Sequence, residues 1–213
     1  MKVAKREKKL LEELFIFGRI IGKYKLGQKY INDLNLKYEN AKTNLASYGP
    51  RLAGRLDSEL DMMNIIESTS AFKKLAQFID NYIELTKHHK LIKNGIYNLD
   101  IIGCWMNDML PGEYNPVHTH HNNTGYSTVL FLKVPEFIND AKDPHKFQDG
   151  ELTFINIDGS SCTTVAPQVG DFYVFQASHM HCVNPFKTKS PKDIRRSMSF
   201  NFILKELKKE EDV

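Results

Sequence analysis

The sequence has few cysteines and no long apolar segment. Its 213 residues include only three cysteines, Cys104, Cys162 and Cys182, an odd number without the spacing of a metal knuckle. We therefore predict reduced cysteines that serve packing, as in a cytoplasmic protein. No stretch is long and apolar enough to span a bilayer, and the first residues are strongly charged. These features predict neither a transmembrane helix nor a signal peptide.

The chain also lacks a strong excess of charge. Its formal net charge is +3, with basic residues gathered in 2–9 and acidic residues in 210–212. No basic stripe is interleaved with aromatic side chains, so we do not expect a nucleic-acid partner. Hydrophobic residues make up 41% of the chain and aromatic residues 11%, which is ordinary globular composition. We predict a helical support region over 1–95, a β-domain over 96–205 and a charged tail over 206–213.

The first ninety-five residues are predicted to be mainly helical. Residues 14–21 are dense in β-formers and predict one short strand. Apolar residues at helical intervals predict an amphipathic helix over 28–42. The hydroxyls of 68–70 offer helix N-caps, and an apolar stripe over 72–83 predicts a helix that packs against a sheet. Residues 52–59 have no clear period, so we leave them irregular or helical.

After Asn94 and Gly95 the pattern changes to β. Short apolar or alternating runs are separated by Gly, Pro, Asn and Asp, which is typical of strands joined by turns. The polar connection over 135–149 is long enough to be a substrate loop. Together these runs predict an α+β protein whose β-part is an antiparallel double-stranded β-helix, or jelly roll, similar to a cupin. The predicted strands are 97–107, 126–134, 151–157, 163–166, 172–176 and 197–204.

The segment Asn-Pro-Val-His-Thr-His-His over 115–121 predicts a metal site. His118 and His120 alternate along what resembles a strand, so both imidazoles face the same side. The best third ligand is His181, which follows another predicted strand. Neutral imidazole suits iron, zinc, copper or nickel, so the histidines alone do not identify the metal. His121 and His179 are weaker candidates, since His121 faces away and His179 lacks the sequence context of His181.

A second candidate feature lies in the last predicted strand. Period-two alternation places Arg195 and Ser197 on one face, together with Ser199 and Asn201. An arginine fork beside a hydroxyl is suited to bind a carboxylate at a fixed distance from a metal.

Seven segments in the C-terminal half then carry a resemblance over roughly 97–204. In their order they resemble the motifs of iron(II)- and 2-oxoglutarate-dependent oxygenases of the prolyl-hydroxylase-like branch, especially small bacterial and phage proteins. The resemblance implies a jelly roll with iron at its open end and a cytoplasmic location, in a bacterium or a phage-infected cell. The segments are 105–107, 116–120, 127–135, 150–154, 167–175, 181–185 and 195–201.

The resemblance also implies roles for single residues. The first and last metal ligands correspond to His118 and His181, while Arg195 and Ser197 correspond to the residues that bind the distal carboxylate of 2-oxoglutarate. The second ligand of the family is usually a carboxylate. Here His120 takes its place, as in a His-x-His subset of these proteins, which raises the charge of the site by one unit.

The implied activity is oxidation of a substrate by O2, with 2-oxoglutarate converted to succinate and CO2. The substrate would be a protein side chain, such as proline, or a small metabolite. Two alternatives stay open: a cupin-like three-histidine metalloprotein, acting as a 2-oxoglutarate-independent dioxygenase or an isomerase, and a non-catalytic binding module. Residues near the motifs that could line the pocket are Trp105, Asn107, Tyr114, Asn122 and Tyr126.

Overall fold

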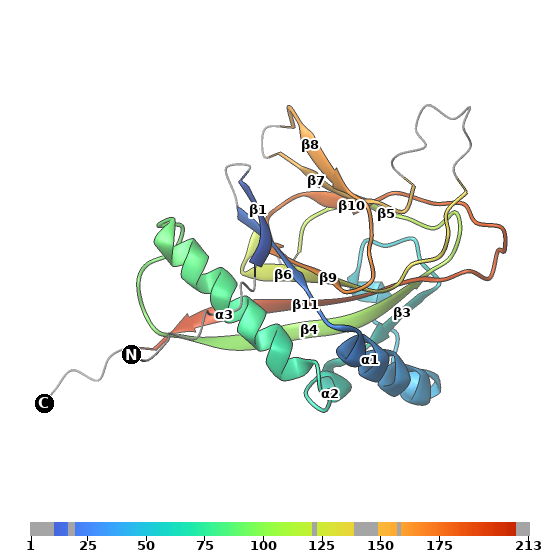
Figure 1. The fold of residues 1–213 in the computed structure, drawn as a ribbon, viewed down its shortest axis with the longest axis horizontal. Helices are drawn as coiled ribbons and strands as arrows, with labels where there is room; N and C mark the ends of the chain where they lie inside the picture. Colours follow the sequence, from blue (N-terminus) through green and yellow to red (C-terminus); the bar gives the residue numbers. More distant parts are fainter. Residues whose placement is uncertain (1–10, 17–19, 121–122, 139–148, 157–158, 208–213) are drawn as a thin grey trace, which may run out of the picture.

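The computed structural model describes residues 11–16, 20–120, 123–138, 149–156 and 159–207, with the backbone alone for 11–16. Two β-sheets face each other, and two longer helices lie along the outer face of the larger sheet (Figure 1). Within these residues, no helix has the length and apolar character needed to cross a membrane. All three cysteines are free.

The larger sheet has seven antiparallel strands in the order β1-β2-β9-β6-β11-β4-β3, and the smaller has four in the order β5-β10-β7-β8. Two antiparallel sheets packed in this way form the predicted jelly roll, and with the helices they make an α+β protein. The larger sheet consists of β1 (Leu11–Ile16), β2 (Ile20–Lys25), β3 (Ser58–Asp61), β4 (Tyr97–Met109), β6 (Tyr126–Lys133), β9 (Asp171–Gln176) and β11 (Arg195–Glu206). The smaller consists of β5 (Asn115–His118), β7 (Leu152–Ile155), β8 (Cys162–Val165) and β10 (His181–Val183).

The helices cover one face of the larger sheet. They are α1 (Gln28–Ala41), the short α2 (Met63–Ile66) and α3 (Phe72–His88), with 3-10 turns at Lys42–Asn44 and Gly49–Arg51. The apolar stripe of α3 buries Leu75, Phe78 and Tyr82 in a core shared with β4, β6 and β11. This burial removes the apolar face of α3 from water and fixes the helix on the sheet.

The predicted N-cap of α3 is wrong. Ala71 precedes the helix, and no side chain caps it. The hydroxyl groups of Ser68 and Thr69 instead donate back to the carbonyls of Ile65 and Ile66, each at 2.7 Å. These hydroxyls therefore serve the end of α2, because a short polar side chain can bond to the preceding turn as readily as to the next one.

The strands of the larger sheet alternate between two cores. In β6, Leu130 and Leu132 face the helices, while Val129 and Phe131 face the space between the sheets. The second core, between the sheets, also contains Phe154 of β7. Both faces of the larger sheet are thus buried, which explains its continuous apolar runs.

The first ninety-five residues supply more strands than predicted. In place of one strand over 14–21 there are two, β1 and β2, and β2 pairs with β9. The segment 52–59, for which we predicted no strand, leads into β3, which pairs with β4 at the other edge. Both edges of the larger sheet therefore come from the N-terminal region. These strands are held by main-chain pairing and are too short to show an apolar period, so the sequence did not reveal them.

Candidate metal and co-substrate site

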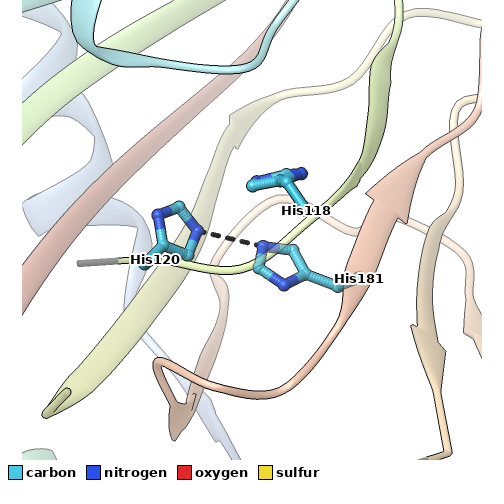
Figure 2. Close-up of side chains that lie close together, drawn as sticks. All are labelled: His118, His120 and His181. Atoms are coloured by element: carbon cyan, nitrogen blue, oxygen red, sulfur yellow. Dashed lines mark hydrogen bonds between the residues drawn. The ribbon is translucent and has the colours of Figure 1, made fainter. Parts of the chain in front are cut away.

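Three histidines converge between the two sheets (Figure 2). His118 ends β5, and His181 begins β10 directly opposite it in the antiparallel register. Their nearest ligand atoms, with those of His120, all lie within 4.8 Å of one another. The Nε2 atoms of His120 and His181 are 3.1 Å apart. The structure thus brings the three predicted ligands into one cluster.

The strand predicted through His120 is shorter than expected, because β5 ends at His118. The chain then bends, and the backbone N–H of His120 donates to the carbonyl of Ala177 at 2.8 Å. This bond holds His120 beside the loop that leads to His181. The bend, rather than strand alternation alone, therefore directs the second imidazole into the cluster.

Hydrogen bonds to the backbone orient two of the rings. Nδ1 of His118 lies 2.7 Å from the carbonyl of Pro116, and Nδ1 of His181 lies 2.8 Å from the carbonyl of His179. A carbonyl only accepts, so each Nδ1 must carry the proton and donate it. Each Nε2 then keeps its lone pair and faces the cluster, which is the arrangement a metal requires.

Burial keeps these imidazoles neutral. Desolvation, with a smaller contribution from His118, lowers the pKa of His120 to about 3. Desolvation also lowers the pKa of His118 and brings that of His181 well below its usual value. Neutral imidazoles with convergent lone pairs fit a divalent transition metal. No carboxylate of a described residue joins the cluster.

Arg195 lies in the same pocket as the histidines. It is 2% exposed, its Nε donates to the carbonyl of Gly150 at 2.9 Å, and its guanidinium stacks 4.8 Å from the centre of the Phe131 ring. Its Nη2 is buried without a hydrogen-bond partner. Desolvation lowers the pKa of this guanidinium to about 9, so it is still charged at neutral pH. A buried cation with an unused donor fits a carboxylate ligand.

The pocket has a free volume of about 30 Å³. Of the predicted residues, Trp105, Asn107 and Ser197 line it, whereas Tyr114 is 42% exposed outside it. Tyr126 faces the helices instead and stacks on Phe202 at 5.0 Å between ring centres. Asn122 and His121 lie outside the described residues. The complete lining is Leu52, Ala53, Gly54, Glu59, Trp105, Asn107, Asn115, His118, His120, Val129, Leu152, His181, Val183, Arg195, Ser197 and Ser199.

One acid of the pocket was not predicted from the sequence. Glu59 is 4% exposed, and it comes from β3, in the segment for which we predicted no strand. Burial, with a contribution from Glu113, raises the pKa of the Glu59 carboxyl to about 7. No motif marks this residue, because a single glutamate after an irregular stretch has the pattern of a surface loop.

The pocket between the sheets of this jelly roll thus brings together three imidazoles that could hold a metal ion and a guanidinium with an unpaired donor. Residues 103–201 match the family described as "Putative 2OG-Fe(II) oxygenase". Among curated proteins, none matches this sequence. The family match and the fold both agree with the superfamily that the motifs resemble.

Solved structures show the same fold over most of the chain. A prolyl-4-hydroxylase from Pseudomonas putida is 17% identical with a TM-score of 0.57, over 86% of this chain and 91% of that one. A prolyl hydroxylase from Trichoplax adhaerens, in complex with a peptide of hypoxia inducible factor, is 11% identical with a TM-score of 0.57, over 86% and 83%. The viral collagen prolyl hydroxylase of Paramecium Bursaria Chlorella virus-1, in complex with 2-oxoglutarate, is 14% identical with a TM-score of 0.51, over 85% and 94%. The fold is that of the prolyl-hydroxylase-like branch.

Proposed function

We propose that this protein is an Fe(II)- and 2-oxoglutarate-dependent hydroxylase in which His118, His120 and His181 hold the metal, while Arg195 and Ser197 hold the distal carboxylate of 2-oxoglutarate. One observation carries the proposal: the unpaired Nη2 of Arg195 is buried in the same pocket as three neutral imidazoles. Burying a cation without an anion costs free energy, so the pocket is suited to bind an anion.

The bound cofactor and co-substrate would supply the oxidising chemistry, turning a substrate C–H, O2 and 2-oxoglutarate into C–OH, succinate and CO2. The protein holds the metal ligands and the co-substrate-binding side chain in position. The backbone carbonyls of Pro116 and His179 fix the rings of His118 and His181. Phe131 and Gly150 hold the guanidinium of Arg195 in place, so that it binds a carboxylate with little loss of side-chain freedom.

His120 changes the charge of the proposed site. Three neutral imidazoles leave the full charge of a divalent metal uncompensated, whereas two imidazoles and a carboxylate would reduce it by one unit. The more positive site favours anionic ligands such as 2-oxoglutarate. The same donor set also supports the second candidate function, a cupin-like three-histidine metalloenzyme that does not use 2-oxoglutarate. The two candidates differ in whether Arg195 binds a co-substrate.

A second opening adjoins the pocket and shares Leu52, Ala53, His118 and His120 with it. We propose that the substrate approaches the metal through this opening. A protein side chain, as in the Trichoplax complex, or a small metabolite would both fit there. A cytoplasmic location in a bacterium or a phage-infected cell stays a prediction from the sequence.

The test is an anaerobic titration of the protein with Fe(II) and then 2-oxoglutarate, followed by the visible charge-transfer band of the chelate. We expect a band in the wild type, none in His181→Ala, and a band in Arg195→Ala only at much higher 2-oxoglutarate concentration. Metal binding without a band would favour the cupin-like function. Absence of metal binding would refute both enzymatic functions.

A further inference from the structure

Three side chains that carry hydrogen-bond acceptors lie together in the wall of the pocket. Glu59, Asn107 and Asn115 all line the pocket, and we call them the Glu59 corner. A Cβ at Gly54 would lie 2.5 Å from Oε1 of Glu59 and 2.5 Å from Oδ1 of Asn115. The carboxylate and the Asn115 amide oxygen therefore both border the same small space beside the Gly54 backbone.

The acceptors of the Glu59 corner lack donors. Within the part of the chain that the structure describes, no hydrogen-bond donor or cationic side chain pairs with the Glu59 carboxylate. Oδ1 of Asn107 is also buried without a partner. Buried acceptors are normally satisfied, so the unsatisfied Asn107 oxygen, with the Glu59 carboxylate beside it in the pocket, indicates a ligand that brings donors.

The sheet register separates Glu59 from Ser197, one of the residues proposed to bind the co-substrate. Glu59 pairs with Asn107 across β3 and β4, and Asn107 pairs with Ser197 across β4 and β11. Adjacent strands are about 4.8 Å apart, so Glu59 stands roughly 10 Å from Ser197 along one row. Glu59 therefore lies two strands from Ser197, and its carboxylate is left for a second molecule.

The charge of the Glu59 carboxylate favours a cation at this corner. Among the described residues that line the pocket and its adjoining opening, Glu59 is the only acid, while Arg195 and Arg51 are the bases. The guanidinium of Arg51 lies in the adjoining opening, 5.2 Å from the ring centre of Tyr48. A neutral ligand would leave the buried carboxylate uncompensated, whereas an ammonium or guanidinium group would pair with it.

We propose that the Glu59 corner binds a protonated nitrogen of the substrate, so that the enzyme oxidises a molecule bearing an amine or guanidine, such as a lysine or arginine side chain. This inference rests on the proposed function, because it places the second molecule beside the metal and 2-oxoglutarate. Glu59 is then a specificity-determining residue. It acts by direct charge pairing with the substrate, and the adjacent amide oxygens of Asn107 and Asn115 accept the remaining N–H donors.

The test compares capped Gly-Lys-Gly with its Nε-acetyllysine counterpart, and capped Gly-Arg-Gly with its citrulline counterpart. Each peptide is titrated by calorimetry, above neutral pH, into protein loaded with Mn(II) and 2-oxoglutarate. We expect the wild type to bind the better cationic peptide at least about tenfold more tightly than its neutral counterpart, as one charge-assisted hydrogen bond allows. Glu59→Gln should abolish that difference, while Glu67→Gln, which removes an exposed glutamate, should keep it.

Equal binding of charged and neutral peptides, no binding of either kind, or a preference that survives in Glu59→Gln would overturn the inference. The charge-transfer titration with Fe(II) and 2-oxoglutarate separates this failure from that of the proposed function. Glu59→Gln should keep the wild-type band, because Arg195, Ser197 and the histidines are unchanged. A missing band in the wild type itself would refute the function instead.

Discussion

Replacing Glu59 by glutamine should change how the stability of the protein depends on pH. The carboxyl group of Glu59 has its pKa raised from 4.5 to about 7, first by burial and then by the charge of Glu113. The folded state therefore binds this proton more tightly than the unfolded state does. The wild type loses stability as the pH rises from below the unfolded value through the folded one, and the loss is complete above about pH 8.

The size of the effect follows from the shift. Raising the pKa from 4.5 to about 7 corresponds to about 3 kcal/mol at 1.36 kcal/mol per unit. Glutamine has nearly the same shape and does not ionise. The free energy of unfolding of Glu59→Gln should thus exceed that of the wild type by about 1 kcal/mol near pH 5 and by about 3 kcal/mol near pH 8.5. For a chain of this length, the latter corresponds to a Tm difference of roughly 6–12 °C.

The assay is urea unfolding of both proteins across this pH range, with a chelator present so that no metal binds the histidines. Groups that do not interact with Glu59 titrate equally in the two proteins, so they cancel in the difference. Glu67→Gln, at an exposed position, is the control and should follow the wild type at every pH. The reasoning is refuted if the free energies of unfolding of Glu59→Gln and the wild type differ by the same amount at every pH from about 5 to 8.5. The pKa of the Glu59 carboxyl would then not be raised by burial.

Three further predictions concern the metal, the co-substrate and the fold. His181→Ala should lower Fe(II) affinity by at least about a hundredfold in metal titrations, since it removes one of three ligands, whereas His179→Ala should reduce it less. Arg195→Ala should raise the Kd for 2-oxoglutarate about 10- to 100-fold in the Fe(II)-loaded protein, because a charge-assisted bond is worth roughly 1.5–3 kcal/mol, and an unchanged Kd would favour the cupin-like function. Asp108→Ala should destabilise the protein by about 3–5 kcal/mol in urea unfolding, because it leaves the guanidinium of Arg196, now bonded to both Asp108 oxygens at 2.5 and 2.8 Å, without its buried partner. If Asp108→Ala unfolds at the same midpoint urea concentration as the wild type, this ion pair adds no stability.

The sequence predicted those parts of the site in which local pattern and chemistry coincide. His118 and His120 are close together in a segment with metal-ligand spacing, and Arg195 follows strand alternation, so their shared pocket could be expected. Tyr126 could not be placed in this way. It belongs to the same strand as residues of the inter-sheet core, and only the register of β6 shows that it faces the helices.

The pocket residue that comes from the N-terminal region could not be predicted from local sequence patterns. Glu59 reaches the site because β3 pairs with β4, a contact between segments about fifty residues apart that no periodicity encodes. Likewise, the hydroxyls of Ser68 and Thr69 were predicted to cap α3, although they bond backward to α2. Both errors arise where tertiary pairing decides between alternatives that are equally acceptable locally.

The position of β11 has a consequence for how the chain reaches its native state during synthesis. This strand is the last one described, yet it lies in the interior of the larger sheet between β6 and β4 (Figure 1). Until it is made, β6 and β4 each present an unpaired edge, and the nascent chain must keep these edges from pairing with other chains. Insertion of β11 closes the sheet and delivers Arg195 to the pocket in the same step. Contacts between such distant segments favour slow folding, so protein refolding from urea should gain metal and co-substrate binding together, late, and as a single kinetic phase.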